Sequence, residues 1–230
     1  MAIDLEKIKR MDMSYPGFSF GYESWALNTY LDVLEEHIGF ASEQYSLRAI
    51  RELKKDADMY PLSETAHEYS EIEEAAEFQI PRYFRIGALI PIWGLFESFV
   101  TDVARYTKNR ESNKLALRDI RAPNFRSQVE KYFEDVLKIA LPWSAEQRKS
   151  VGALQEVRNI IAHRNGRLMD LHPDKQRELE KLVESVDGVE IQHSSIIVSG
   201  RYIAASKSLV FEMLEDLINM IADRYDGPII

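Results

Sequence analysis

The sequence predicts a mainly α-helical fold with one small β-hairpin near residues 189–198. Apolar residues recur every three or four positions along most of the chain, as in helices that bury one face. Two short alternating runs, Val189–Ile191 and Ile196–Val198, instead flank a turn at residues 193–195. Because the 230 residues contain no internal repeat and no Gly/Ser linker, we expect a single domain over residues 1–230.

The N-terminal third is predicted to be helical on both sides of Gly39. Leucine and isoleucine recur at helical spacing over residues 27–38 and again over residues 47–53, which fits two helices or one long bent helix. An acidic helix follows: Thr65, with Glu68 three residues later, is a capping signal that opens it. The same reading takes Pro81 as its end.

The next segment, residues 81–109, is the most apolar of the chain. Pro91 in its interior predicts a kink. Gly87 and Gly94 leave a smooth strip that another helix could approach closely. Because the apolar run Ile86–Phe96 is far shorter than the roughly 20 residues that span a bilayer, we expect a core helix and no membrane contact.

Helices are also predicted in the second half of the chain. Ser144 is expected to cap the helix that carries the most informative residues, and Gly166 is expected to stop it. The expected ranges are 124–139, 144–165, 173 to about 186, and a closing helix through Val210 and Ile221 that Gly227 and Pro228 stop.

Composition and charge exclude several classes of site. With no cysteine there is no disulfide, thiolate metal site or thiol nucleophile, and the charged N-terminus does not resemble a signal peptide, so we expect a cytoplasmic protein. No second His/Glu motif accompanies His67 and its glutamates, so we expect no metal. The net charge of −9 repels phosphate on average, so any nucleic-acid contact must be local. Residues 146–167 form the one basic island, with Arg148, Lys149, Arg158, Arg164 and Arg167.

Arg158 breaks the apolar pattern of its helix. It lies four residues after Leu154 and three before Ile161, where the helical period calls for an apolar side chain. An unpaired buried charge costs several kcal/mol, so we expect a carboxylate partner, a cleft or an interface. Asn159 and His163 are i and i+4 neighbours, so the amide can orient the imidazole and Arg158 can converge on both.

The segment V-R-N-I-I-A-H-R-N-G at residues 157–166 resembles the signature helix of the HEPN superfamily of helical nucleotide-binding and ribonuclease domains. That motif is Arg, a polar residue, three further residues and His, which Arg158, Asn159 and His163 match position by position. The helix around residues 95–99 resembles an earlier family helix whose acidic residue faces the motif, so Glu97 is the candidate partner of Arg158. The resemblance covers residues 80–221 and leaves residues 1–79 as a helical N-terminal extension.

The resemblance implies a metal-independent endoribonuclease without cofactors. His163 would take the proton of a ribose 2′-OH or protonate the leaving 5′-oxygen, Arg158 would hold the phosphate, and Asn159 would orient either group. The implied role lies in antiviral defence, a toxin–antitoxin pair or stress growth arrest, with an antitoxin or regulatory partner. Asn165 stands where toxins paired with nucleotidyltransferase antitoxins tend to carry Tyr, which argues against a modified-tyrosine toxin. The expected RNA-binding residues are Arg148, Lys149, Arg164 and Arg167.

The resemblance also implies a homodimer with a composite active site, in which one His163 acts as base and its symmetry mate as acid. Ile160 lies on the side of the helix away from Val151, so we expect it to be exposed as partner surface. The alternative is a non-catalytic helical binding or dimerisation module, in which Arg158 and His163 are structural. Residues 167–172 repeat the Arg-to-His interval, but they are expected in a loop and lack the polar second residue.

Overall fold

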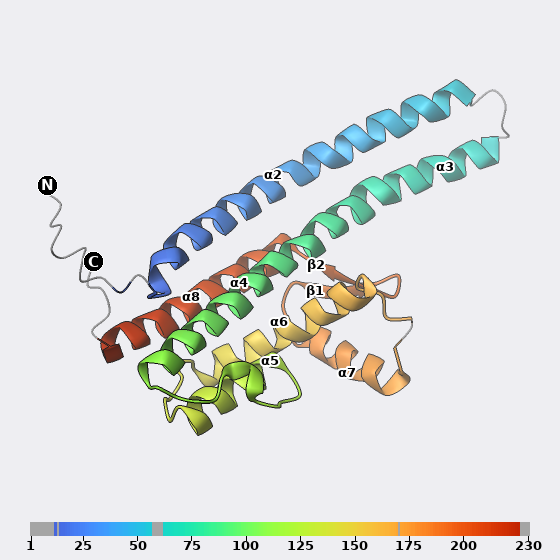
Figure 1. Ribbon diagram of the computed structural model, residues 1–230. Helices are drawn as coiled ribbons and strands as arrows, with labels where there is room; N and C mark the ends of the chain where they lie inside the picture. Colours follow the sequence, from blue (N-terminus) through green and yellow to red (C-terminus); the bar gives the residue numbers. More distant parts are fainter. Residues whose placement is uncertain (1–11, 13, 57–61, 170, 226–230) are drawn as a thin grey trace, which may run out of the picture. The chain divides into compact units, whose positions relative to one another are not determined.

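A computed structural model describes residues 12, 14–56, 62–169 and 171–225 of the chain (Figure 1). These residues are mainly helical with one two-stranded antiparallel hairpin, as the sequence predicts. They group into two compact units, each assembled from separate stretches of the chain. The first unit contains the described residues up to 27, then 92–156 and those from 205 onward, and the second contains residues 28–91 and 157–204.

The N-terminal third forms one helix, α2, over Gly17–Asp56. Of the two alternatives that the sequence left open, the single long helix is therefore correct. Gly39 does not interrupt it, because a glycine inside a helix costs only about 1 kcal/mol relative to alanine. Burial of the side chains of Leu31, Ile38 and Leu53 offsets this cost.

The acidic helix does not end at Pro81, so that prediction is wrong. Helix α3, Leu62–Glu74, continues through a π-helical turn, Ala75–Gln79, into α4, Ile80–Arg110. The amide of Ile80 bonds to the carbonyl of Ala75, five residues earlier, so the hydrogen-bond ladder is already widened where proline lacks its N–H. The helical run therefore passes through Pro81, and Pro91 also lies inside α4.

The continuous helical run over residues 62–110 is long and apolar enough to cross a membrane by length and composition alone. Its apolar window is 56% buried inside the molecule, and the core helix of a soluble protein passes the same test. Ala88, Leu89 and Ile92 are fully buried, as the predicted core helix requires.

The first unit has an aromatic core. Trp93, Phe96, Tyr132 and Phe133 are at most 1% exposed. These residues come from α4 and from α5, Phe125–Glu130, with its π-helical continuation, Lys131–Val136, so the helix expected over residues 124–139 ends three residues early. Helix α8, Gly200–Tyr225, closes the chain as described, and the predicted stop at residues 227 and 228 lies outside the described residues.

The start of α6, Ala145–Arg164, belongs to this unit and confirms the predicted cap. The Ser144 hydroxyl accepts the amide N–H of Gln147 at 3.1 Å, and the Gln147 side chain accepts the amide N–H of Ser144 at 2.8 Å. This reciprocal pair satisfies two amides that the first helical turn would leave unbonded.

The second unit contains the predicted hairpin. Strand β1, Val189–Gln192, pairs with β2, Ser195–Val198, in a register that places Gln192 opposite Ser195. His193 and Ser194 form the two-residue turn with φ of 46° and 56°, the left-handed geometry that matches the twist of a hairpin. Helix α7, Pro173–Glu184, precedes the hairpin and confirms the charged helix expected there.

Candidate functional site

The last turns of α6 belong to the second unit and carry the residues on which the functional prediction depends. The helix ends where Asn165 and Gly166 adopt φ of 52° and 75°. The amide of Gly166 donates back to the carbonyl of Ile160 at 3.2 Å, which closes the helix end. The carbonyl of Gly166 accepts the amide of Ile196 in β2 at 2.8 Å, so the hairpin anchors the residue that follows the helix.

Two side chains of α4 hold the same helix end from another direction. The guanidinium of Arg82 donates to the main-chain carbonyl of Asn165, and the side-chain amide of Asn165 donates to the Tyr83 hydroxyl at 3.5 Å. Arg82 is only 4% exposed, and its Nε finds no hydrogen-bond partner among the residues that the structure describes. A cation at the carbonyl end of a helix offsets the negative end of the helix dipole.

Sequence reasoning missed Arg82. Its bonding partner lies 83 residues further along the chain and is a main-chain carbonyl, which no side-chain pattern encodes. The available signal was an arginine placed directly after Pro81 at the start of the most apolar segment. A cation in such a segment needs a partner, as Arg158 does in α6.

Arg158 lies on the buried side of α6, as its spacing predicts. Its side chain is half-buried, and its terminal NH1 group donates to the Asn159 side-chain oxygen at 3.1 Å. The Nε of Arg158 is buried, and none of the described residues accepts a hydrogen bond from it. The structure therefore joins two members of the predicted triad and leaves this buried donor without an acceptor in the described part of the chain.

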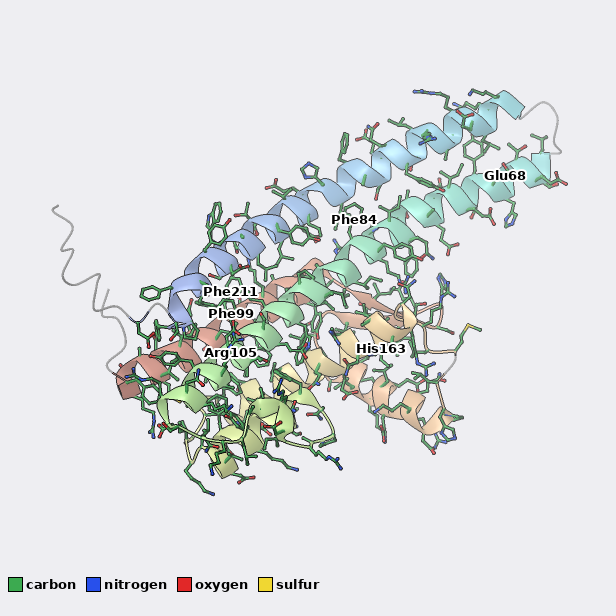
Figure 2. All side chains as sticks on the ribbon, viewed as in Figure 1. Glu68, Phe84, Phe99, Arg105, His163 and Phe211 are labelled. Carbon is green, nitrogen blue, oxygen red and sulfur yellow. The ribbon has the colours of Figure 1, made fainter. Side chains whose placement is uncertain are left out.

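His163 lies exposed on the last turn of α6 (Figure 2). Among the described residues, no hydrogen bond joins its imidazole to Asn159, whose oxygen accepts from Arg158 instead. The expected orientation of His163 by that amide is thus not present in this structure. The imidazole is accessible to a ligand.

Glu97, the candidate partner of Arg158, lies in the first unit. Its carboxylate accepts the indole N–H of Trp93 at 3.1 Å, one turn earlier on α4. Its predicted pairing with Arg158 joins residues of different units and stays a prediction.

Ile160 is buried, so its expected exposure as a partner surface is wrong. It is 8% exposed, and Val157, one turn earlier, is fully buried. The last two turns of α6 bury a wider arc than the stripe through Val151 and Leu154 indicated, because the helix end lies among the hairpin and α4. Ile160 therefore offers no exposed surface for a dimer.

The basic island is divided between the two units. Arg148 and Lys149 lie on the first turn of α6, in the first unit, whereas His163 lies on its last turn, in the second unit. Arg148 pairs with Glu134 at 2.8 Å and lies 3.8 Å from Glu130.

The remaining members of the island, Arg164 and Arg167, are exposed at the end of α6, within four residues of His163. Arg148, by contrast, is paired with carboxylates of its own unit.

The described residues of the repeated Arg-to-His interval, 167–169, 171 and 172, lie outside any helix, as expected. His172 is the N-cap of α7, where its Nδ1 accepts the amide N–H of Asp174 at 3.4 Å. His67, on the acidic helix, lies 3.4 Å from Glu71, and both side chains are largely exposed. Within the described ranges, no group of three or more acidic or histidine side chains is arranged to hold a metal ion.

Comparison of the chain with protein-family models, with curated proteins and with solved structures finds no match.

Proposed function

We propose that this chain is a metal-independent endoribonuclease that cleaves RNA by attack of a ribose 2′-OH on the adjacent phosphate. One observation carries the proposal: Arg158, Asn159 and His163 follow the HEPN motif on the last turns of α6, where a half-buried cation lies one turn from an exposed imidazole. A cation that holds the phosphate and a side chain that can accept or donate a proton are the two components that this chemistry needs.

The reaction requires two proton transfers. Neutral His163 takes the proton of the 2′-OH as its oxygen bonds to phosphorus, and the bond from phosphorus to the 5′-oxygen breaks as that oxygen is protonated. The products are a 2′,3′-cyclic phosphate and a 5′-hydroxyl. Arg158, whose side chain is half-buried, stabilises the charge that develops on the phosphoryl oxygens.

The electrostatics around the helix end favour an anion only because of the arginines. The carbonyl end of a helix is negative and by itself repels phosphate. Arg82 engages the carbonyl of Asn165, and Arg164 and Arg167 add positive charge at the surface. RNA binding is therefore local on a chain of net charge −9 and should weaken strongly with salt.

The mechanism also needs an acid that protonates the leaving 5′-oxygen. A second copy of the chain would supply it through its own His163, which is the composite site that the family resemblance implies.

A non-catalytic binding module is the second candidate function. The observation that favours it is the hydrogen bond that Arg158 donates to the side-chain oxygen of Asn159, because this oxygen is then engaged by Arg158 and does not orient His163. An untethered imidazole loses part of the benefit of general base catalysis.

The two candidates separate in one assay. Purified chain is incubated with single-stranded RNA and excess EDTA, beside His163→Ala and beside DNA of the same sequence. We expect the wild type to cleave RNA and leave cyclic or 3′-phosphate ends, and His163→Ala and the DNA reaction to show no product. Wild-type cleavage that stops in EDTA would overturn the mechanism, and RNA binding without cleavage would favour the binding module.

A further inference from the structure

Helix α2 exposes a regular stripe of side chains between residues 30 and 47. Its members alternate at intervals of three and four residues, which is the heptad spacing by which one helix packs along another. Four are large and apolar, with exposures between 48% for Tyr30 and 60% for Phe40. We call this stripe the α2 seam; it consists of Tyr30, Val33, His37, Phe40, Gln44 and Leu47.

The seam is separate from the face that α2 buries within its own unit. That face contains Leu31 and Ile38, which are 5% and 6% exposed. A single exposed apolar side chain needs no explanation, but a stripe in heptad register over 18 residues does.

An open groove of about 480 Å³ borders the seam. Tyr30, Val33 and His37 line one side of it, and Phe84, labelled in Figure 2, lines the other with Gly87. A Cβ built on Gly87 would meet no atom within 4 Å, so this part of the glycine strip expected from the sequence is open. A helix lying on the seam would also fill the groove.

The charges beside the seam identify the occupant. Glu36 and Glu43 flank one side of it and Arg48 flanks the other, and all three are exposed. In a parallel pair of identical helices, flanking residues five apart meet across the interface. Glu43 and Arg48 have that separation, whereas antiparallel pairing would bring the glutamates of the two copies together.

We propose that the α2 seam is a homodimer interface, occupied by the α2 seam of a second copy that lies parallel and in register. Glu43 of each protomer then pairs with Arg48 of the partner subunit, and the apolar layers of Val33, Phe40 and Leu47 stack on their symmetry mates. This interface does not depend on RNA cleavage, because its residues lie on α2 and those of the candidate site lie on α6.

Sedimentation velocity over a range of concentrations tests the dimer. We expect the wild type to dimerise, and Phe40→Glu to raise the dissociation constant by roughly 100-fold, because each dimer contains the substitution twice. Met169→Glu is the matched control, since Met169 is 79% exposed and is not part of α2, and it should dimerise like the wild type. A wild type that stays monomeric, or a Phe40→Glu dimer of unchanged affinity, would overturn the proposal.

Two further variants test the direction of pairing. Glu43→Arg should weaken the dimer and Arg48→Glu, added to it, should restore it, because the swap recreates the same pairs. The chain has no cysteine, so Gln44→Cys introduces a single thiol that parallel, in-register pairing brings to its own symmetry mate. We expect an oxidised Gln44→Cys dimer and no cross-link with Glu73→Cys on α3. Absence of the Gln44→Cys cross-link from a chain that still dimerises would overturn the parallel arrangement.

Discussion

The guanidinium of Arg82 donates a hydrogen bond to the main-chain carbonyl of Asn165, so a buried cation of α4 holds the end of the helix that carries His163. The contact joins two segments 83 residues apart in the chain. It fixes the last turn of α6 against the start of α4. The geometry of the candidate site therefore depends on a residue outside its motif.

Replacing Arg82 with Ala should destabilise the second unit. The substitution leaves the Asn165 carbonyl without its charged donor and opens a cavity in a buried position, which together cost about 2–4 kcal/mol. Urea unfolding measures the loss. Arg85→Ala is the control, because its ion pair with Glu35 is partly exposed and should contribute less than about 1 kcal/mol. An equal loss in the free energy of unfolding for the two variants would show that the Arg82 contact stabilises the chain no more than the exposed ion pair does.

The hairpin turn predicts a stabilising substitution. Ser194 adopts φ of 56°, a conformation that costs an L-residue about 1 kcal/mol and costs glycine almost nothing. Ser194→Gly should therefore raise the free energy of unfolding by about 0.5–1 kcal/mol. Ser195→Gly, one residue later in β2, should lower it, because glycine weakens a strand. The prediction is contradicted if both glycines change stability in the same direction.

Where the sequence predicted the fold correctly, the signals were local. Ser144 and Gln147 lie within one turn, and the hairpin is defined by alternation on either side of His193. Pro81 misled the prediction because the consequence of a proline depends on the ladder around it. The widened turn before it has no residue signature of its own, so it could not be read from the sequence.

Only the part of the candidate site that lies on α6 could be predicted from the sequence. The period of α6 placed Arg158 on its buried side, and the structure agrees. Ile160 was misplaced because the arc that a helix buries depends on which elements surround it, and Arg82 was missed for the same reason. A motif specifies the positions of side chains along a helix, whereas their partners come from segments distant in the chain.

Stability at alkaline pH should depend on Tyr225. Burial, and a hydrogen bond that its hydroxyl donates to Glu111 at 2.6 Å, raise the pKa of Tyr225 to about 12. An unfolded tyrosine titrates near pH 10, so the folded chain holds the proton more tightly. Its stabilising contribution is present below about pH 10 and is lost as the pH rises towards about 12. The free energy of unfolding, measured across this pH window, should fall less steeply for Tyr225→Phe than for the wild type. Tyr22→Phe is the control, because Tyr22 is 69% exposed.

The hydrogen bond between Tyr225 and Glu111 should also affect stability at acid pH, where the direction of the pKa shift is reversed. The Tyr225 hydroxyl, followed by Arg224, lowers the pKa of Glu111 below its usual value. The stability that this carboxylate contributes is therefore present above its usual pKa and is lost as the pH falls through the lowered value. Tyr225→Phe should therefore also reduce the loss of stability at acid pH. A variant that matches the wild type at both extremes would show that the contact contributes nothing.

The proposed ribonuclease gives the sharpest prediction on single side chains. His163→Ala and Arg158→Ala should each reduce RNA cleavage at least about 100-fold, because one removes the base and the other removes the cation that stabilises the phosphoryl group. His172→Ala should leave cleavage unchanged, since His172 caps α7 and lies outside the motif helix. Arg158→Lys keeps the charge but loses the planar donor array, so an intermediate rate is expected. A melting curve for each variant separates loss of chemistry from loss of fold. Cleavage that survives His163→Ala in a folded chain, or that disappears with His172→Ala, would show that the catalytic histidine is not His163.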